Sequence, residues 1–241
     1  MSRFTAQLQA ELQLVSRNGE QLLLTLVIPV VLLVFFSVVD VLPTGTDDAV
    51  DFLAPGVFAL AVMSTAMVSL GIATGFERSY QVLKRLGATP LGRSRLIAAK
   101  IVSVLVIEVV QFDVLVPVAL ALGWEPGGNR WPLALAAVVL ASMAFAGIGL
   151  AMAGRLRGEI NLAAVNALYL VLLLLGGMVI PVAELPATLR AVAEVLPSGA
   201  LAEVIRDSLG GASTRAGEWW VVLAAWAVAA PLVARRLFRF L

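Results

Sequence analysis

The sequence predicts an all-α membrane protein in which one domain, residues 1–241, crosses the bilayer six times. Hydrophobic residues make up 61% of the chain and the mean hydropathy is +0.98, whereas soluble domains are usually about half apolar. Six apolar stretches approach the roughly 20 residues that a spanning helix needs. Charged residues are only 14% of the chain and are clustered between these stretches. One soluble core could not hide so much apolar surface, so lipid is the expected solvent.

The six predicted spans follow one another along the whole chain. They are expected at residues 22–41, 52–75, 98–122, 131–153, 161–180 and 219–234. Pro29, Pro117 and Pro231 fall inside spans, where each is expected to kink its helix or to lie near a helix end.

Residues 1–20 are predicted to form a helix that lies in the membrane interface. Phe4, Leu8, Leu12 and Val15 recur at helical spacing, with the polar residues Arg3, Gln7, Glu11 and Arg17 between them. A polar tail without fixed structure is the alternative.

The loop at residues 76–97, between the second and third spans, is predicted to be a docking element. Residues 76–100 carry six of the basic residues, and Val82, Leu83 and Leu86 give them a short apolar face. Gly87 is typical of a helix end, and the Thr89-Pro90 pair prevents continuation. The expected structure is a short helix, a turn and a basic entry into the third span. The alternative is a basic loop that only sets the topology.

Residues 181–217, between the fifth and sixth spans, are too polar to cross the membrane. Apolar residues recur at helical spacing on both sides of Pro197, which predicts two short amphipathic helices. This hairpin is expected to lie on the outer interface or to enter the membrane and return.

Counting Lys and Arg in the loops predicts the orientation. With the N-terminus inside, 13 basic residues lie on the cytoplasmic side and 4 on the outer side. Both termini are therefore expected in the cytoplasm, and the chain is expected in the cytoplasmic membrane as a multi-pass protein.

Two groups of uncharged residues are given structural roles. Gly71, Gly75, Gly147, Ala151 and Gly154 are small residues that let helices approach closely, either within one chain or at a seam between two copies. Four tryptophans, at positions 124, 131, 219 and 220, are expected to anchor the outer membrane interface.

Several chemistries are excluded by what the sequence lacks. The chain has no Cys and no His, which removes disulfides, thiol chemistry, His-based catalysis and the commonest metal ligand. Its net charge of +1 gives no electrostatic reason to bind nucleic acid. No phosphate-binding loop occurs, so the chain is not expected to hydrolyse ATP. We predict no catalytic residue, no metal site and no cofactor bound by this chain.

Polar residues inside the spans are the candidates for a substrate pathway, because intramembrane acids are costly and often functional. The candidates are Glu108, Gln111, Asp113 and Asn166. Glu108 and Asp113 are separated by about 140° around a helix, whereas Glu108 and Gln111 lie closer together. The alternative is structural: Glu108 is protonated or hydrogen-bonded to Asn166, Asn161 or a Ser, and Asp113 reaches the outer interface.

Two stretches resemble the type-2 ABC exporter permeases, which are six-span subunits of drug, lipid and polysaccharide exporters. In residues 77–93 the matching positions are Glu77, Arg78, Leu83, Leu86, Thr89, Pro90 and Arg93, whereas Gln81 and Val82 replace the usual Gly and Thr. In residues 176–211 the matching positions are Gly177, Pro181, Leu185, Pro186, Leu196, Pro197, Leu201 and Arg206.

The resemblance implies a permease that exports a hydrophobic or amphipathic drug or lipid. The interfacial helix at residues 1–20 and residues 77–93 would dock on a separate ATPase subunit, which would bind ATP and Mg²⁺. A second permease copy or a paralogue would complete the transporter. The exit gate would be the outer hairpin, with Gly177, Pro181, Pro186, Pro197 and Arg206. The rivals are a proton-coupled secondary transporter that uses Glu108 and Asp113, a membrane anchor for a partner, and an intramembrane aspartyl protease, which lacks a second acid suitably placed.

Overall fold

The computed structural model describes residues 2–39, 49–127, 130–179, 181–210 and 216–237, and the regular secondary structure of these residues is helical, with no strand among them. The all-α prediction is therefore confirmed. The elements are α1 (Arg3–Arg17), α2 (Gly19–Val38), α3 (Ala49–Met63), the π-helix η1 (Ser64–Ser69), α4 (Leu70–Ser79), α5 (Val82–Gly87), α6 (Arg93–Ala121), α7 (Trp131–Ala153), α8 (Gly158–Leu175), the 3₁₀ turn η2 (Val182–Glu184), α9 (Ala187–Ala193), α10 (Pro197–Leu209) and α11 (Ala216–Leu237).

Five stretches among the described residues are long and apolar enough to span a membrane: Val50–Ser79, Arg93–Ala121, Trp131–Ala153, Gly158–Leu175 and Gly217–Leu237. A sixth is obtained when Arg3–Arg17 and Leu22–Val38 are counted as one span bent by 66°. The structure thus agrees with the six predicted spans. Residues 41 and 180, the predicted ends of the first and fifth spans, lie outside the described residues.

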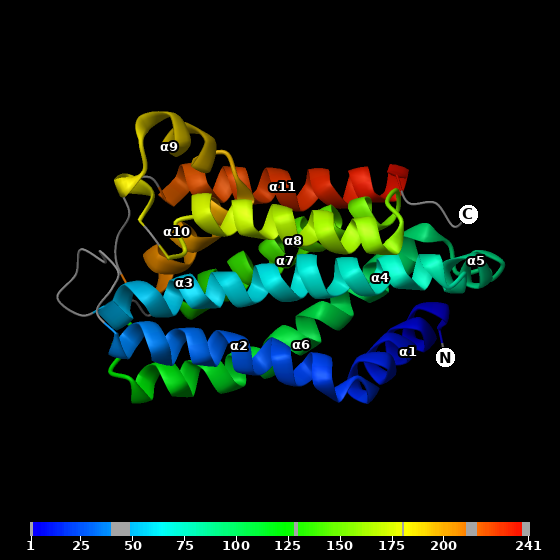
Figure 1. Ribbon diagram of the computed structural model, residues 1–241, viewed down its shortest axis with the longest axis horizontal. Helices are drawn as coiled ribbons and strands as arrows, with labels where there is room; N and C mark the ends of the chain where they lie inside the picture. The colour runs from blue at the N-terminus through cyan, green and yellow to red at the C-terminus, as the bar shows by residue number, and fades with distance from the viewer. Residues whose placement is uncertain (1, 40–48, 128–129, 180, 211–215, 238–241) are drawn as a thin grey trace.

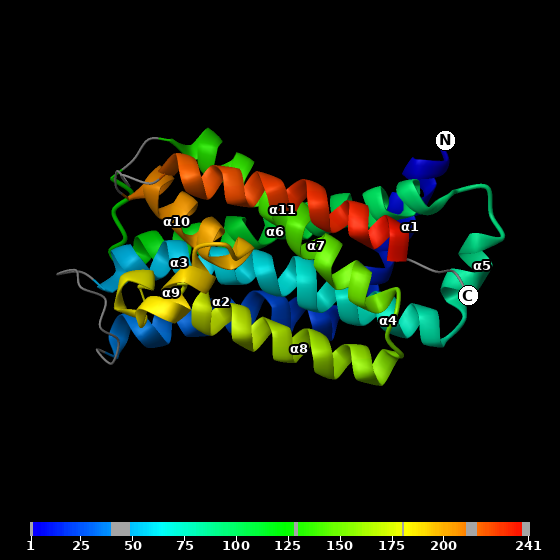
Figure 2. The same ribbon diagram turned by 90° about the horizontal axis from the view of Figure 1, so that it is seen from above.

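The spans form an elongated bundle with its helices roughly along the long axis (Figure 1). The continuous stretch α3–η1–α4 runs through the middle and is the most buried of the candidate spans. It packs against α2, α7 and α8, and α7 in turn packs along α11. Viewed from above, α11 and α8 are nearest the viewer and lie toward opposite edges of the bundle, and α2 lies beneath them (Figure 2). We call the two ends of the bundle the α5 end and the α9 end.

Glycines allow neighbouring helices of this chain to pack closely against one another. A Cβ added at Gly147 would lie 2.5 Å from the backbone nitrogen of Pro231, so only glycine lets α7 approach α11 this closely. A Cβ on Gly71 would lie 3.2 Å from the Cα of Gly149 on α7. The intrasubunit interpretation is confirmed for these two glycines.

Two of the four tryptophans do not serve as surface anchors. Trp124 is 2% exposed and Trp219 is 7% exposed. The ring of Trp124 packs edge to face on Phe58 and on Trp131, with centroids 5.2 and 6.1 Å apart. The interface prediction was wrong for Trp124 and Trp219, because both rings are buried in the bundle: Trp124 in the loop after α6 and Trp219 in the first turn of α11.

The hairpin between the fifth and sixth spans contains the two predicted helices, α9 and α10, and residues 211–215 lie outside the described residues. Helix α10 is almost wholly buried and packs against α3, α7 and α11. By contrast, Leu189 and Val192 of α9 are exposed. The hairpin therefore inserts α10 into the bundle and leaves α9 at its edge, as Figure 1 shows at upper left.

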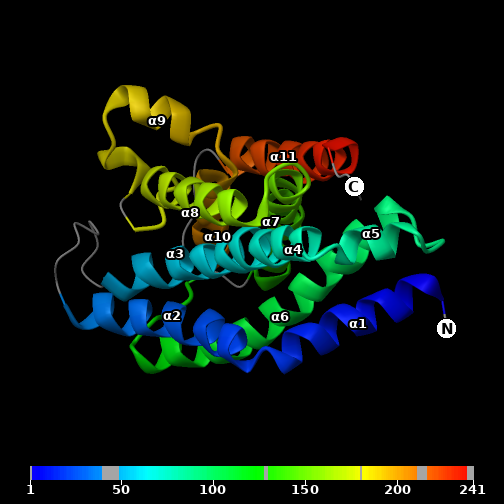
Figure 3. The same ribbon diagram turned by 45° about the vertical axis from the view of Figure 1, so that its right-hand side comes forward.

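The N-terminal helix α1 agrees with the predicted helix at residues 1–20. Ser2 caps it, since its hydroxyl accepts a hydrogen bond from the Thr5 amide at 3.1 Å. The predicted apolar stripe is half-buried and packs against α6 (Figure 3). Glu11, one of the polar residues between the stripe residues in the sequence, is only 6% exposed and is therefore buried beside the stripe.

Candidate functional site at the α5 end

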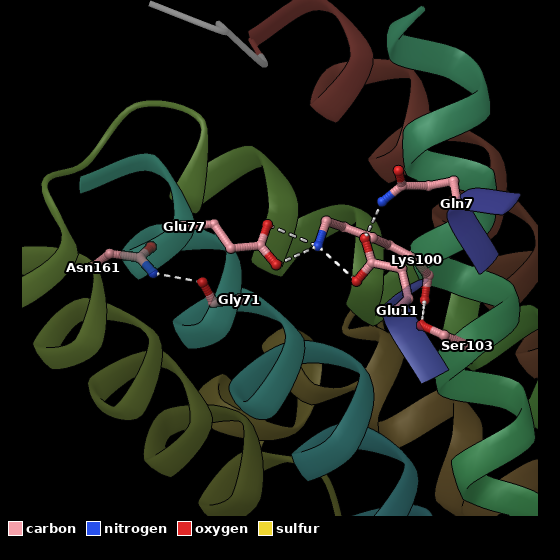
Figure 4. A network of polar contacts seen from close by, with 7 residues as sticks. All are labelled: Gln7, Glu11, Gly71, Glu77, Lys100, Ser103 and Asn161. Atoms are coloured by element: carbon pink, nitrogen blue, oxygen red, sulfur yellow. Dashed lines mark hydrogen bonds and ion pairs between the residues drawn. The ribbon is translucent and has the colours of Figure 1, made fainter. Parts of the chain in front are cut away.

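Three charged side chains from distant parts of the sequence meet at the α5 end of the bundle. The ammonium of Lys100 on α6 lies 3.0 Å from Oε2 of Glu11 on α1 and 2.9 Å from both carboxylate oxygens of Glu77 on α4. Figure 4 shows the ammonium between the two carboxylates. Lys100 is 1% exposed, so this charge triad is a buried connection among α1, α4 and α6.

Neighbouring hydrogen bonds hold the charge triad in place. The Gln7 side-chain amide donates to Glu11 Oε1 at 2.7 Å, and the Ser103 hydroxyl donates to the Lys100 carbonyl at 2.8 Å. On the other side of α4, the Asn161 amide of α8 donates to the Gly71 carbonyl at 2.8 Å (Figure 4). Helix α4 is therefore fixed by polar contacts to α6 and α8 within an otherwise apolar bundle.

Helix α5 follows α4 after a sharp turn and projects from the end of the bundle (Figure 3). Gln81 has a left-handed backbone with φ of 62°, a conformation that favours glycine. Leu83 is buried and anchors α5, whereas Lys84 and Arg85 are exposed. The predicted short helix and its end at Gly87 are confirmed.

The seven residues predicted to couple to an ATPase occupy two different environments. Glu77 belongs to the charge triad, and the Arg78 guanidinium donates to the carbonyls of Ala153 and Leu156 at the end of α7, at 3.3 and 3.5 Å. Leu83 and Leu86 pack toward the bundle. The other three, Thr89, Pro90 and Arg93, are exposed.

The turn after α5 is tied to α1. The Arg3 guanidinium donates to the Pro90 carbonyl at 3.1 Å, and the Thr89 hydroxyl donates to the Leu86 carbonyl at 2.6 Å. Helix α1 thus contacts both the charge triad and the loop that carries α5.

Two adjoining hollows open beside the charge triad. The first has a volume of about 440 Å³ and is bounded by α1, α2, α4 and α6, with Glu11, Glu77 and Lys100 in its wall. The second, of about 620 Å³, lies between α2 and the α3–η1–α4 helix. Both are lined by Asn18, Thr25, Ser69, Ala73, Phe76 and Tyr80. Volumes of this size are typical of small-molecule sites.

The four predicted pathway residues do not form one site. Glu108 is buried and accepts a hydrogen bond from the Ser142 hydroxyl of α7 at 2.6 Å, which matches the structural alternative of a bond to a serine. Gln111 accepts from the Thr65 hydroxyl and donates to the Thr25 carbonyl, both at 2.9 Å. By contrast, Asp113 and Asn166 are exposed on the outer faces of α6 and α8.

Through its hydrogen bond with Thr65, Gln111 contacts the π-helix η1, and such a local widening of a helix often marks a functional site. Sequence reasoning missed η1, Thr65 and the pairing of Lys100. For the triad a signal existed, because Glu77 ends one apolar stretch and Lys100 begins the next.

Arg206 fastens the hairpin predicted to form the exit gate to the α9 end of the bundle. Its guanidinium lies 4.0 Å above the Phe52 ring of α3, donates to Glu203 at 2.9 Å, and donates to the Gly177 carbonyl after α8. Burial lowers the pKa of the Arg206 guanidinium, and Glu203 opposes this by favouring the cation.

The prolines predicted for the same gate bound the hairpin elements. Pro181 immediately precedes η2, Pro186 precedes α9, and Pro197 is the first residue of α10.

A helical bundle with five or six candidate spans among the described residues, a helix projecting from one end and hollows between the spans is the arrangement of a multi-pass membrane protein. The family model described as ABC-2 type transporter matches residues 2–209. The chain therefore belongs to the ABC-2 type transporter family and is a permease, the membrane subunit of an ABC transporter, rather than a catalytic subunit. A search of curated proteins finds no match.

Proposed function

We propose that this permease exports a hydrophobic or amphipathic drug or lipid with energy from a separate ATPase subunit, which binds ATP and Mg²⁺ and docks at the α5 end. The observation that supports this most strongly is the charge triad. It joins α1 and α6 to the last turn of α4, at Glu77, five positions before α5 begins. A push on α5 would therefore reach three helices at once.

The exposed groups of α5 suit a docking surface. Leu83 is fully buried and fixes the helix, so a force on the exposed Lys84 and Arg85 moves the bundle instead of bending a loop. Because Lys84 and Arg85 are adjacent cations, the complementary surface on the ATPase is expected to be acidic. Arg78 serves a different purpose, since it holds the end of α7 to α4.

The α5 end is assigned to the cytoplasm and the α9 end to the outside, in accord with the excess of Lys and Arg predicted on the inner side. Both termini are then cytoplasmic. A second permease copy or a paralogue completes the transporter, and the α9–α10 hairpin serves as the exit gate, with Arg206 as its fastening to α3 and α8.

Affinity purification from native membranes tests this function. We expect an ATPase with a phosphate-binding loop to copurify with the tagged wild-type chain. The double variant Lys84→Glu/Arg85→Glu should retain at most about a tenth of it, because two like-charge contacts replace two attractive ones.

The matched control is Arg155→Glu/Arg157→Glu. It reverses two exposed cations at the same end of the bundle, in the turn between α7 and α8, and should retain the ATPase. Absence of any ATPase from the wild-type preparation, or equal retention by both double variants, would contradict docking through α5.

A further inference from the structure

The hollow beside the charge triad has a charged wall at one end and apolar walls elsewhere. The ionisable side chains in its wall, among the described residues, are Glu11, Glu77, Lys100 and Tyr80. Two carboxylates face one ammonium, so the formal charges of the wall leave an excess of one negative charge. A net charge held away from water is unfavourable unless a counter-charge approaches it.

The aromatic side of the hollow also suits a cation. The rings of Phe76 and Tyr80, one helical turn apart at the end of α4, are stacked with centroids 6.1 Å apart and an interplanar angle of 21°. Both rings line both hollows. Ring faces attract organic cations, and more strongly where water is excluded. Tyr80 is 71% exposed, whereas the side chain of Glu77 is only 17% exposed.

The rest of the wall is apolar and extends to the surface that faces lipid. Leu14, Val15, Leu22, Leu70, Val104 and Ile107 contribute to the first hollow. The second hollow continues along Leu24 and Ile28 of α2, which are 47% and 50% exposed on the lipid-facing side. A ligand can therefore enter sideways between α2 and α4 with its apolar part in lipid.

From these features we infer that the hollow is a binding site for a lipophilic organic cation, with the positive charge beside Glu77 and Glu11 and the apolar groups between α2 and α4. This deepens the proposed function by naming the chemical class of the cargo, and it rests on that function. The same wall would repel a lipophilic anion. A neutral molecule would gain the apolar contacts but leave the excess charge unbalanced.

The position of the site adds a consequence for coupling. A bound cation would balance the charge at the joint among α1, α4 and α6, the same joint through which α5 is connected to the bundle. Occupancy should therefore tighten this joint, and the ligand should raise the thermal stability of the permease by mass action.

The test uses two isosteric probes of opposite charge on the purified full-length permease in lipid nanodiscs, without ATPase or nucleotide. Radiolabelled tetraphenylphosphonium should bind saturably and raise the Tm, whereas tetraphenylborate should do neither. Glu77→Gln and Glu11→Gln should each weaken tetraphenylphosphonium binding by about tenfold or more, which corresponds to about 1.4 kcal/mol. Glu159→Gln, an equal charge change at an exposed site on α8, should leave it unchanged.

A variant that leaves the charge triad intact guards against misfolding of the Gln variants. Ser69→Phe places a ring in the wall shared by both hollows and should abolish binding by filling the space. Equal binding of the two probes, failure of tetraphenylphosphonium to bind the wild type, or full binding by Ser69→Phe would each overturn the assignment. These results leave the proposed function intact, because ATPase copurification through α5 is measured separately.

Discussion

Replacement of Lys100 by methionine should destabilise the permease more than neutralising either carboxylate with which it pairs. Methionine keeps most of the side-chain volume and removes the ammonium that lies within 3.0 Å of both Glu11 and Glu77. Two carboxylates would then face one another at a site where Lys100 is 1% exposed. Breaking a buried ion pair by removal of one partner costs about 3–5 kcal/mol, and Lys100 is the shared partner of two pairs.

The carboxylate variants should be milder because the ammonium keeps one counter-charge. Glu11→Gln leaves both carboxylate oxygens of Glu77 bound to Lys100, so the free energy of unfolding should fall by only about 1–2 kcal/mol. The triple variant Glu11→Gln/Glu77→Gln/Lys100→Met removes every charge of the triad. It should recover at least about 2 kcal/mol relative to Lys100→Met, since no buried charge is then left unpaired.

Unfolding of the purified chain in mixed micelles, followed by tryptophan fluorescence during titration with denaturing detergent, measures these free energies. Lys84→Met is the control, because it makes the same replacement on the exposed face of α5. The triad would not be a buried structural joint if Lys100→Met lowered the free energy of unfolding by less than about 1 kcal/mol, or if the triple variant were no more stable than Lys100→Met.

Three further perturbations test separate parts of the account. Gln81→Gly should raise stability by about 0.5–1 kcal/mol, because relief of the left-handed strain exceeds the added entropy of the unfolded chain, whereas Gln81→Val should lower the Tm. Gly147→Ala should lower the free energy of unfolding by about 1–3 kcal/mol, because the added Cβ pushes α7 away from α11. Gly19→Ala should lower it much less, because a Cβ at Gly19 has no atom within 4 Å; equal Tm values for the two variants would contradict this. Arg206→Gln should lower the free energy of unfolding by about 2 kcal/mol and speed proteolysis of the hairpin, since it removes the cation above the Phe52 ring. An unchanged cleavage rate would show that Arg206 does not fasten the hairpin to the bundle.

The sequence was sufficient for the spans, the short helix α5 and the hairpin, because each depends on local hydropathy and on turn residues such as Gly87 and Pro197. The apolar stripe of α1 was also visible. The burial of Glu11 could not be predicted from this spacing, because an acid in an amphipathic helix usually lies on the side of water. Only the buried ammonium of Lys100, 89 positions away, makes the inward position favourable.

The candidate site could be predicted only in part for the same reason. Glu77 was singled out, but its partner Lys100 was counted among basic residues that set topology. The π-helix η1 has no sequence signal, since its geometry depends on contacts such as that between Thr65 and Gln111 from another helix. Long-range pairs of this kind join residues that no local pattern relates.

The central claim is that work enters this permease from a cytoplasmic ATPase through α5, and cysteine labelling tests it most directly. The chain contains no cysteine, so Lys84→Cys provides a single reporter on the exposed face of α5. A membrane-impermeant maleimide should label it in inside-out vesicles and not in intact cells, and labelling should fall when the ATPase subunit is bound. Labelling from the outside of intact cells, or labelling unaffected by the ATPase, would contradict the account.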